Sequence, residues 1–449
     1  MKTYYFYLYI LLFSLCALVS SSCTKGTPQD DTLIEQVKVL NDENSALSAR
    51  IIIELTRSDV VSLRYRIKGS EENWKIVSAE KSLFKHRIPL LHLLENTVYE
   101  FDVLINGKSV SGLRNFTTAK IPQWVKDFYN SNDEGIVNQS EGYFLFSNMT
   151  SPSCTYVLDH RGQLVWYRVG PNVVKSVHMT ADHAILMIED ENKTNYADGN
   201  IVLKCNLAGD TLFYGKVGNK GFDQMVHHDL KQNNAGNYVL ITNTFKDGRI
   251  WDGLVQWSSS GSKIWEWNTS EFETYFPSSF EGQPWVNSVF IDQDDHYLIS
   301  LRAIHQIWKV HSKSGEVIWR LGENGDLVMD RSSEFVLQHY AHRNHKGDIM
   351  LFDNGHTKRP YSRILAFEID ERLKVAKTKI VVNVPSTYYS PIMGSVILMK
   401  DNSLLVTSST TGTFMKLDLT GKLLWKKKVN GMLYRVEYLD VFNGMLGNF

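Results

Sequence analysis

The chain has 449 residues, a net charge of -1, and a composition that is 43% hydrophobic and 12% aromatic. This provides enough apolar material for a large core, and the length suggests two or three domains. Because there is no basic excess, nucleic acid is not an expected partner.

The N-terminal stretch has the composition of a secretory signal. Lys2 precedes an almost wholly apolar run at residues 4–19, and three serines, residues 20–22, then lead to Cys23. A cationic start, an apolar core and small residues before a break are typical of such signals. A cysteine after three small residues resembles the lipidation site of bacterial lipoproteins, although a serine stands where an aliphatic residue is usual.

We therefore predict a lipoprotein-type signal peptide over residues 1–22, lipidation of Cys23, and a polar tether over residues 23–31. The protein is then expected in the periplasm or at the cell surface, anchored to the membrane by lipid. An ordinary signal peptide with a chance cysteine is the alternative. No later stretch has the roughly eighteen continuous apolar residues that a membrane span needs.

Two further cysteines follow, Cys154 and Cys205. In an oxidising compartment they could form a disulfide. Two separate buried thiols are an equally good interpretation, because nothing in the sequence brings the two residues together.

Residues 32–120 are predicted to form a small, all-β, sandwich-like domain. Residues 49–55 and 61–67 are rich in β-branched side chains, and residues 98–104 alternate apolar with polar. A docking or export role is expected for this domain rather than a catalytic one.

The end of this domain resembles a fibronectin type III segment. Tyr99 stands in the place of that fold's corner tyrosine, and residues 116–118 resemble its last strand. Residues 121–139 are predicted to be the linker to the second domain.

From about residue 140 the chain repeats. Each of six segments has an apolar strand, a Gly turn, and a strand whose aromatic lies four residues past the Gly. The period is about fifty residues, and in the degenerate fifth copy Arg372 replaces the Gly. Several short strands in each such unit are typical of a β-propeller. We predict a six-bladed β-propeller with an active-site channel over residues 140–449. The copies end at Trp166, Phe213, Trp265, Trp319, Ala376 and Trp425.

A second pattern has the same period as the repeat. In four successive segments a candidate site residue lies eight residues before a turn residue. In a propeller the first strand of each blade lines the central channel, so equivalent positions from successive blades converge near the axis. The sequence therefore predicts a site built from residues far apart in the chain. His178 lies four residues out of phase and is a minor candidate. The in-phase pairs are His228 before Gly236, Asn287 before Asp295, His339 before Gly347, and Gly394 before Asn402.

Several motifs surround these positions. They are His227-His228-Asp229 with residues 233–240, Val286-Asn287-Ser288 with Ser300-Leu301-Arg302, Gln338-His339 with residues 351–355, Tyr361-Ser362-Arg363, and residues 433–437. With them the chain resembles the bacterial arylsulfate sulfotransferases over nearly its whole mature length. The resemblance implies a periplasmic six-bladed propeller with an N-terminal β-domain. It also implies transfer of a sulfo group from one phenolic ester to another phenol without a nucleotide donor.

The resemblance implies a role for each of three residues. His339 matches the nucleophilic histidine, and neutral imidazole is a competent nucleophile that would give a sulfohistidine. His228 matches a ligand of the sulfo group, and it can donate a hydrogen bond or carry the proton of a phenol. Arg302 matches an arginine whose fork of donors fits two sulfo oxygens.

Asn287, Trp285 and His227 are the expected substrate-binding residues. Alternation along a strand favours a His227 side chain that points away from the channel. The family usually shows His-x-Asn-Ser, and here Trp285 replaces that histidine; tryptophan can stack on an aromatic ring but supplies no base. No cysteine pair precedes His339, so no disulfide is expected beside it.

Other interpretations remain open. A lone histidine at a strand end is usually structural, and Arg302 could pair with an inner carboxylate. His342, His345 and His356 are predicted to be solvent-side loop residues. No close His/Asp/Glu spacing predicts a metal site, and no cofactor is expected.

The expected partners are a phenolic sulfate donor and a phenolic acceptor. The alternative function is a non-catalytic propeller lipoprotein that binds sulfated or aromatic ligands. The sequence does not indicate the natural substrates or an oligomeric state.

Overall fold

The computed structural model describes residues 33–130, 142–194, 197–219 and 222–442. The predicted signal peptide, Cys23 and the tether lie outside these residues. The all-β prediction is confirmed, because almost all the regular structure is strand in many antiparallel sheets. None of the helices in the described part of the chain has the length and apolar character required to cross a membrane.

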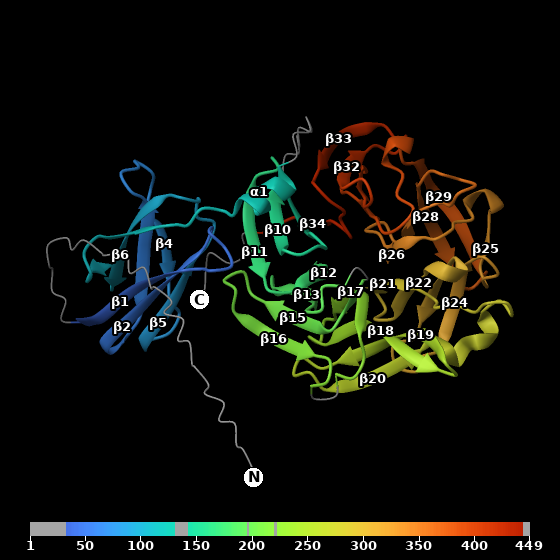
Figure 1. Cartoon of the computed structure of the whole chain (residues 1–449), viewed down its shortest axis with the longest axis horizontal. Coiled ribbons are helices and arrows are strands. Elements are labelled where there is room, and N and C mark those ends of the chain that lie inside the picture. The colour runs from blue at the N-terminus through green and yellow to red at the C-terminus, as the bar shows by residue number, and fades with distance from the viewer. Residues whose placement is uncertain (1–32, 131–141, 195–196, 220–221, 443–449) are drawn as a thin grey trace, which may run out of the picture.

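The N-terminal domain consists of two sheets that share one core (Figure 1). Apolar side chains from alternating strand positions, such as Ile51, Leu63 and Phe101, fill the space between the sheets. The Tyr99 hydroxyl accepts a hydrogen bond from the Leu94 amide at 2.8 Å, as expected of a corner tyrosine. One sheet contains β1 (Ile34–Asn41), β2 (Ala49–Asp59) and β5 (Leu83–Leu90); the other contains β3 (Val61–Ile67), β4 (Lys75–Ser78), β6 (Val98–Ile105), β7 (Lys108–Ser109) and β8 (Arg114–Thr117).

The predicted linker contains a short helix, α1 (Gln123–Tyr129). Val125 and Phe128 lie three residues apart on one helix face and are buried. The Phe128 ring stacks on that of Tyr156 in the next domain, 5.2 Å between centroids. This segment therefore fastens the N-terminal domain to the rest of the molecule. Residues 131–139 of the predicted linker lie outside the described residues.

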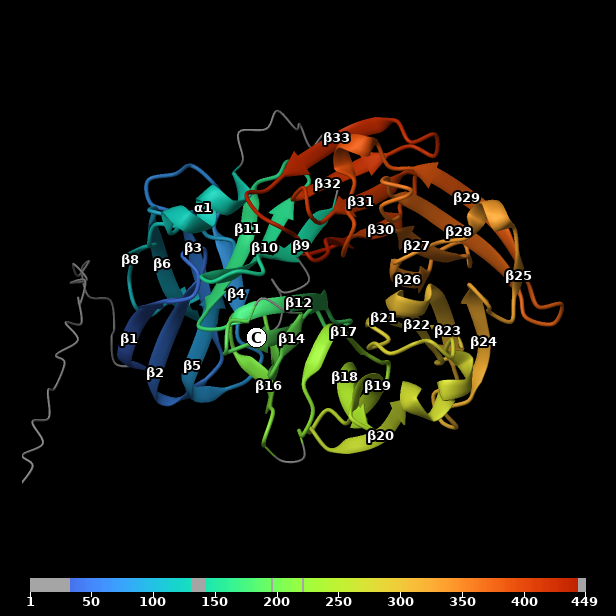
Figure 2. The same ribbon diagram turned by 45° about the vertical axis from the view of Figure 1, so that its right-hand side comes forward.

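Beyond α1 the described chain forms six further sheets of four or five strands, antiparallel except for one parallel pair, β25–β29. Figures 1 and 2 show these sheets following one another around a common centre. Strand β34, from the end of the chain, completes the first of them by pairing with β9. The first strands of neighbouring sheets lie against each other: β12 contacts β17, β17 contacts β21, β21 contacts β26, and β26 contacts β30.

Each of the six sheets is assembled mainly from strands that are consecutive in the chain. The first sheet contains β9 (Tyr143–Ser147), β10 (Ser153–Asp159), β11 (Leu164–Gly170) and β34 (Glu437–Leu439); the second contains β12 (Val173–Met179), β13 (Ile185–Asp190), β15 (Ile201–Cys205) and β16 (Thr211–Lys216). The third contains β14 (Asp198–Gly199), β17 (Val226–Gln232), β18 (Tyr238–Lys246), β19 (Arg249–Trp257) and β20 (Lys263–Asn268); the fourth contains β21 (Val286–Ile291), β22 (Tyr297–Leu301), β23 (Gln306–Val310) and β24 (Val317–Gly322). The fifth contains β25 (Val328–Met329), β26 (His339–Arg343), β27 (Ile349–Asp353), β28 (Arg363–Asp370) and β29 (Val375–Asn383); the sixth contains β30 (Ser395–Leu398), β31 (Leu404–Ser408), β32 (Thr413–Leu417) and β33 (Leu423–Lys428). Short 3-10 segments lie at Thr269–Tyr275, Arg302–Ile304, Arg331–Ser333 and Ser386–Tyr388.

The repeated aromatic lies on an outer strand of each sheet, namely β11, β16, β20, β24 and β33, with Ala376 on β29 in the degenerate copy. Its role is to join one sheet to the next. The Trp166 indole donates to the Leu207 carbonyl in the second sheet at 2.9 Å. The Trp319 indole donates likewise to the Glu371 carboxylate in the fifth sheet at 3.0 Å. The sequence period therefore reflects how each sheet packs against its neighbour.

Cys154 and Cys205 are both buried and free. Burial raises the pKa of the Cys205 thiol to about 11 and raises that of Cys154 further. The structure thus agrees with two separate thiols rather than a disulfide.

Candidate functional site

The candidate residues lie where the innermost strands bulge. On β17 the register with the next strand shifts between Val226 and Leu230, and on β26 it shifts between His339 and His342. On β21 the extra residue is Asn287 itself. Because a bulge breaks the regular alternation and re-aims side chains, strand alternation alone does not place these residues.

The backbone is also unusual around these bulges. Residues with a left-handed φ are His228 (60°), Trp285 (56°), Leu337 (57°) and Tyr340 (55°). For residues other than glycine this conformation carries a cost, and such strain clusters at functional sites.

His339 begins β26, and its ring is almost fully buried. Its Nδ1 lies 2.7 Å from Asn354 Oδ1 and 3.1 Å from the Leu337 carbonyl oxygen. The Asn354 oxygen is identified as an acceptor because the amide nitrogen of that side chain donates to the carbonyls of Ser390 and Met393. Nδ1 of His339 therefore carries the proton, and Nε2 keeps its lone pair.

The environment keeps this imidazole neutral. Burial is the main cause that lowers the pKa of His339 to about 3; the Asn354 hydrogen bond opposes the shift, and the charges of Arg302 and Arg435 add to it. At Nε2 the one polar contact within the described residues is the Met393 amide at 3.3 Å, a long hydrogen bond. A neutral histidine with a weakly engaged Nε2 has the state that a nucleophile requires.

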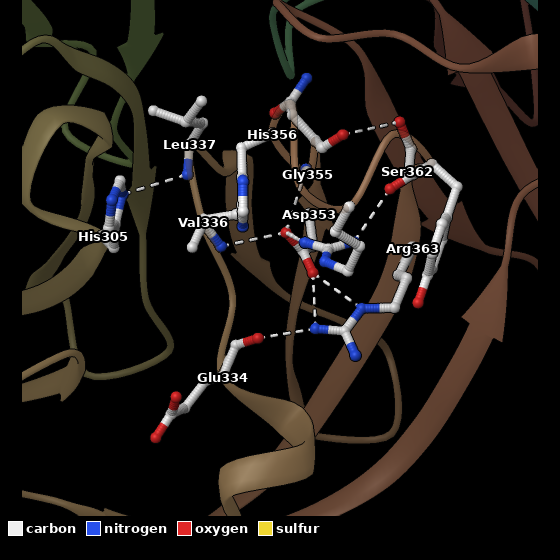
Figure 3. Close-up of polar contacts among 12 residues, drawn as sticks. His305, Glu334, Val336, Leu337, Asp353, Gly355, His356, Ser362 and Arg363 are labelled. Carbon is white, nitrogen blue, oxygen red and sulfur yellow. Dashed lines mark hydrogen bonds and ion pairs between the residues drawn. The ribbon is translucent and has the colours of Figure 1, made fainter.

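The segment that leads to His339 is held rigidly from behind (Figure 3). The Asp353 carboxylate accepts hydrogen bonds from the Val336 amide at 3.0 Å and from Arg363 Nε at 2.9 Å. Arg363 also donates to the Glu334 carbonyl at 2.6 Å. These contacts fix the approach to β26, so the position of the His339 ring is set before any ligand arrives.

His228 lies in the bulge of β17 and is nearly buried. Burial lowers the pKa of His228 well below its usual value, and the neighbouring His227, His339 and Arg302 lower it further. Its Nδ1 lies 2.7 Å from Nδ1 of His227. Within the described residues its Nε2 has no hydrogen-bond partner, so this atom is available to a ligand. His227 itself is fully buried behind His228.

Arg302 begins the short helical segment after β22. Its backbone amide donates to the Trp285 carbonyl at 3.1 Å. Within the described residues the guanidinium makes no ion pair, so the alternative of an inner carboxylate partner finds no support. Burial lowers the pKa of Arg302, and its charge acts on both His228 and His339. An unpaired, half-buried arginine beside two histidines is a ready site for an anionic group.

Asn287 is fully buried and faces the segment before His339. Its Nδ2 donates to the Gln338 carbonyl at 2.7 Å, whereas its Oδ1 has no partner within the described residues. Its own carbonyl accepts a hydrogen bond from the Tyr434 hydroxyl at 3.0 Å. The structure therefore gives Asn287 a positioning contact and leaves one buried acceptor open.

Two aromatic rings flank His228. The Trp285 and Tyr434 rings each lie 6.1 Å from the His228 ring, at interplanar angles of 70° and 65°. Trp285 is 39% exposed, so its indole forms part of the open edge of the site.

Other residues form a second group near the far ends of the same strands, which we call the far-end cluster: His178, Asp229, Lys231, Arg435 and Glu437. His178 Nδ1 lies 2.7 Å from a Glu437 oxygen, and Arg435 Nη1 lies 2.9 Å from Asp229. Lys231 Nζ lies 3.4 Å from Asp229 and 3.5 Å from Glu437. A cavity of about 560 Å³ opens at this end and is lined by His178, Lys231 and Glu437. His178 is therefore placed away from His339.

Sequence reasoning missed some residues and misplaced one. Lys175 is the in-phase residue of its sheet, eight before His183, but its ammonium is paired with Asp190 at 3.3 Å. The eight-residue spacing escaped notice here because the turn residue is His183, which adopts a left-handed φ of 56° although it is not Gly, Asn or Asp. The prediction of His342 as a solvent-side residue is wrong: its side chain is buried in β26, and burial lowers its pKa to about 4.

Two other predictions from this stretch agree with the structure. His345 is exposed and His356 is half-buried at the surface.

In the described residues, no group of three or more His, Cys, Asp or Glu side chains is arranged to hold a metal ion.

Comparison with solved structures finds proteins of low similarity. A protein of unknown function from Bacteroides caccae is 11% identical over 67% of this chain and 100% of its own, with a TM-score of 0.45. A putative 6-phosphogluconolactonase from Bacteroides uniformis is 10% identical over 85% of this chain and 100% of its own, with a TM-score of 0.40. At such TM-scores the likeness assigns neither fold nor activity. No curated protein matches the sequence.

A family comparison is more informative. The model of the family described as Arylsulfotransferase (ASST) matches residues 128–430. The match spans well over half of the chain and includes every candidate site residue from His227 to His339. It confirms the resemblance that the motifs indicate. The chain belongs to the arylsulfotransferase family.

Proposed function

We propose that this protein moves a sulfo group from a phenolic sulfate ester to a phenol through a sulfohistidine at His339, without a nucleotide donor. Family membership supports arylsulfotransferase activity in general, with a phenolic sulfate donor and a phenolic acceptor. The observation that carries the finer proposal is the neutral His339 ring, held by Asn354 with its Nε2 lone pair retained. Nδ1 is already protonated, so Nε2 is the atom that reacts.

In the first step Nε2 of His339 attacks the sulfur of the donor. The N–S bond forms, the bond from sulfur to the aryl oxygen breaks, and the phenolate leaves with the electron pair of that bond. Arg302 offers two parallel donors to the sulfo oxygens and balances their charge. Because Arg302 has no protein partner in the described residues, binding the sulfo group breaks no existing ion pair.

In the second step the oxygen of the acceptor phenol attacks the same sulfur. The new S–O bond forms, the N–S bond breaks, and His339 returns to its neutral state while the phenol proton passes to a base. His228 is the proposed base, since its Nε2 is open and its ring lies between Trp285 and Tyr434. Trp285 is proposed to stack on the aryl ring of either substrate.

The fold proposed around this site is a six-bladed propeller closed by β34. The six sheets around a common centre and the β34–β9 pair support it.

We further propose a periplasmic or cell-surface protein anchored by lipid at Cys23, on the N-terminal sequence pattern alone. Cys23→Ala should then move the protein from the membrane to the soluble fraction; unchanged membrane association would count against the anchor.

The test of the proposed function is direct. Pure protein is mixed with 4-nitrophenyl sulfate in the absence of an acceptor, and the expected result is one sulfo group on His339, detected by mass spectrometry as an acid-labile adduct. Added phenol should then remove the adduct and yield phenyl sulfate. No adduct and no turnover of any aryl sulfate would favour the alternative, a propeller that binds sulfated or aromatic ligands without catalysis.

A further inference from the structure

Behind His228 lies a chain of three buried polar groups that the proposed reaction has not yet used. His228 Nδ1 lies 2.7 Å from His227 Nδ1, and His227 Nε2 lies 3.3 Å from Oδ1 of Asp252. His227 and Asp252 are both fully buried. His227 Nε2 makes no aligned hydrogen bond within the described residues, and the Asp252 carboxylate is the acidic group that lies within ion-pair distance of it. The order of the three groups resembles the way a carboxylate orients a catalytic imidazole.

Asp252 is itself fixed in place. It comes from β19, and its Oδ1 accepts a hydrogen bond from Gln283 Nε2 at 2.6 Å. Its Oδ2 accepts from the Val286 amide at 2.7 Å, directly after Trp285. The carboxylate therefore cannot rotate away from His227 without breaking two short hydrogen bonds.

This arrangement determines which nitrogens carry protons. A carboxylate only accepts hydrogen bonds, so the proton of His227 resides on Nε2, facing Asp252. Nδ1 of His227 is then an acceptor, and the 2.7 Å contact requires His228 to donate from its Nδ1. The remaining nitrogen, His228 Nε2, is left with a lone pair toward the site. The opposite assignment would place two lone pairs face to face between His227 and Asp252, in a buried position where the repulsion is strong.

We propose that Asp252 and His227 are positioning residues that hold His228 in the tautomer of a general base for the acceptor phenol. The inference rests on the proposed sulfotransfer and assigns the acceptor half of it. When His228 Nε2 takes the phenol proton, the imidazolium that forms is connected through His227 to the Asp252 charge. That proton is then available for the phenolate that leaves in the next donor step. Protons therefore balance over one complete cycle.

The amide variant Asp252→Asn gives a distinctive expectation. In this variant the asparagine oxygen stays opposite the Val286 amide, so the NH₂ group takes the position of Oδ1 and the Gln283 side-chain amide turns its oxygen toward it. The NH₂ group then donates to His227 Nε2, and the His227 proton moves to Nδ1. His227 would then donate to His228 Nδ1, and His228 would carry its proton on Nε2. The variant loses its base but gains a donor near the leaving oxygen. The two half-reactions should therefore respond in different directions, which mere loss of structure would not produce.

The experiment separates the half-reactions in the full-length protein. Adduct formation is followed from 4-nitrophenyl sulfate without acceptor, and the preloaded enzyme is then mixed with phenol or with pentafluorophenol, which is already ionised at the assay pH. We expect Asp252→Asn to slow transfer to phenol about 100-fold, as loss of a general base does. Transfer to pentafluorophenol should change less than about threefold, and adduct formation should not slow, because neither step needs a base.

Two controls accompany the variant. Asp190→Asn neutralises another fully buried carboxylate, bound to Thr194 in the neighbouring sheet, and should affect phenol and pentafluorophenol equally. His227→Gln separates His228 from Asp252 and should repeat the selective loss with phenol. If Asp252→Asn fails to fold, nitrogen NMR of histidine-labelled wild type still decides the matter: His228 should be protonated at Nδ1 and His227 at Nε2.

Equal loss with both acceptors, a parallel fall in adduct formation, or the opposite tautomers in the spectrum would overturn the relay. These results differ from failure of the proposed function, which appears as the absence of any adduct in the wild type.

Discussion

The His339 site and the far-end cluster contrast sharply, although they are close together: Asp229 of the cluster directly follows His228 of the site. At the far end the charges are paired, as in His178–Glu437 and Arg435–Asp229. At the His339 end the polar groups are left open. The Arg302 guanidinium has no carboxylate partner within the described residues. Asn287 Oδ1 is buried there without a hydrogen-bond donor.

The difference teaches how to separate a structural polar cluster from a reactive one in this fold. Both ends contain histidine, arginine and buried polar groups, so composition does not distinguish them. What distinguishes them, within the described residues, is whether the charged side chains already have an ion-pair partner in the protein. Unsatisfied buried groups cost stability and are retained where a ligand completes them. Arg302 and Asn287 Oδ1 at the His339 end fit that description; in the far-end cluster the charges are already paired, although Nε of Arg435 lacks a hydrogen bond.

The largest expected effect concerns the proposed nucleophile. His339→Ala should abolish the sulfo adduct and lower transfer at least about 1,000-fold, because no other group forms the covalent intermediate. Mass spectrometry and a phenol-release assay measure the two results. His345→Ala is the matched control, an exposed histidine just after the same strand, and should leave both unchanged. Retained turnover in His339→Ala would show that His339 is not the nucleophile and that the open polar groups around it do not mark the reactive site.

The far end should respond in stability rather than chemistry. Glu437→Gln breaks a buried ion-pair cluster and should lower the free energy of unfolding by about 3 kcal/mol, with the reactivity order of donors unchanged. Burial opposes the shift, but His178 and Lys231 lower the pKa of Glu437 to about 2 from its ordinary 4.5. The carboxylate thus stabilises the fold above pH 4.5, and this advantage over the variant should vanish as the pH falls toward 2. Urea denaturation at several pH values checks both statements.

Arg302→Lys tests the open arginine. A single ammonium cannot reproduce the two-pronged contact with the sulfo oxygens, so kcat/KM should fall about 100-fold while the fold keeps its stability. The same assay should show little change for Arg343→Lys, since Arg343 is bound to Asp292 at the far end of β26. An Arg302→Lys enzyme as active as the wild type would show that Arg302 does not bind the sulfo group.

Trp285→His restores the residue that the family usually carries. A second proton-handling group should help donors with poor leaving groups by about tenfold and those with good leaving groups hardly at all. The slope of rate against leaving-group acidity is the measurement. An unchanged slope would mean that Trp285 lies too far from the leaving oxygen to matter.

The smallest effect is an absence of pH dependence. Because burial lowers the pKa of His339 to about 3, adduct formation should change less than about twofold between pH 7.5 and pH 5. A histidine with the ordinary value of 6.5 would lose on the order of 30-fold over that range. Single-turnover rates measured across this interval distinguish the two.

Much of the repeat, and the candidate residues that share its phase, could be predicted from the sequence. The repeat identified an aromatic at a fixed step past a turn, and the structure shows that this residue lies on an outer strand, where sheet-to-sheet packing requires a large side chain. The eight-residue phase selected His228, Asn287 and His339 as candidates, because in each of these sheets the same number of residues separates this position from the turn that follows. The bulges were not foreseen, since they depend on pairing between strands rather than on composition.

Residues that act across strands escaped the sequence analysis. Asn354 entered the sequence analysis only as one of residues 351–355 in the motif with His339, yet its side chain is what holds the His339 ring. Asp252 lies on β19, away from the innermost strand β17, and has no local pattern to mark it. His342 was misplaced because three histidines in one polar stretch suggested a loop, whereas the strand begins at His339.

The pairing of β34 with β9 has a consequence for how the protein is made. The strand that completes the first sheet is synthesised after every other described strand, so β9 stays an unpaired edge until the other five sheets have been made. The same terminal stretch carries Tyr434, which contacts Asn287, and Arg435, which holds Asp229. A chain that stops a few dozen residues early would therefore lack both its closing strand and one wall of its site. Biosynthesis thus links completion of the first sheet to completion of the site, and we expect a shortened product to be inactive and prone to aggregate.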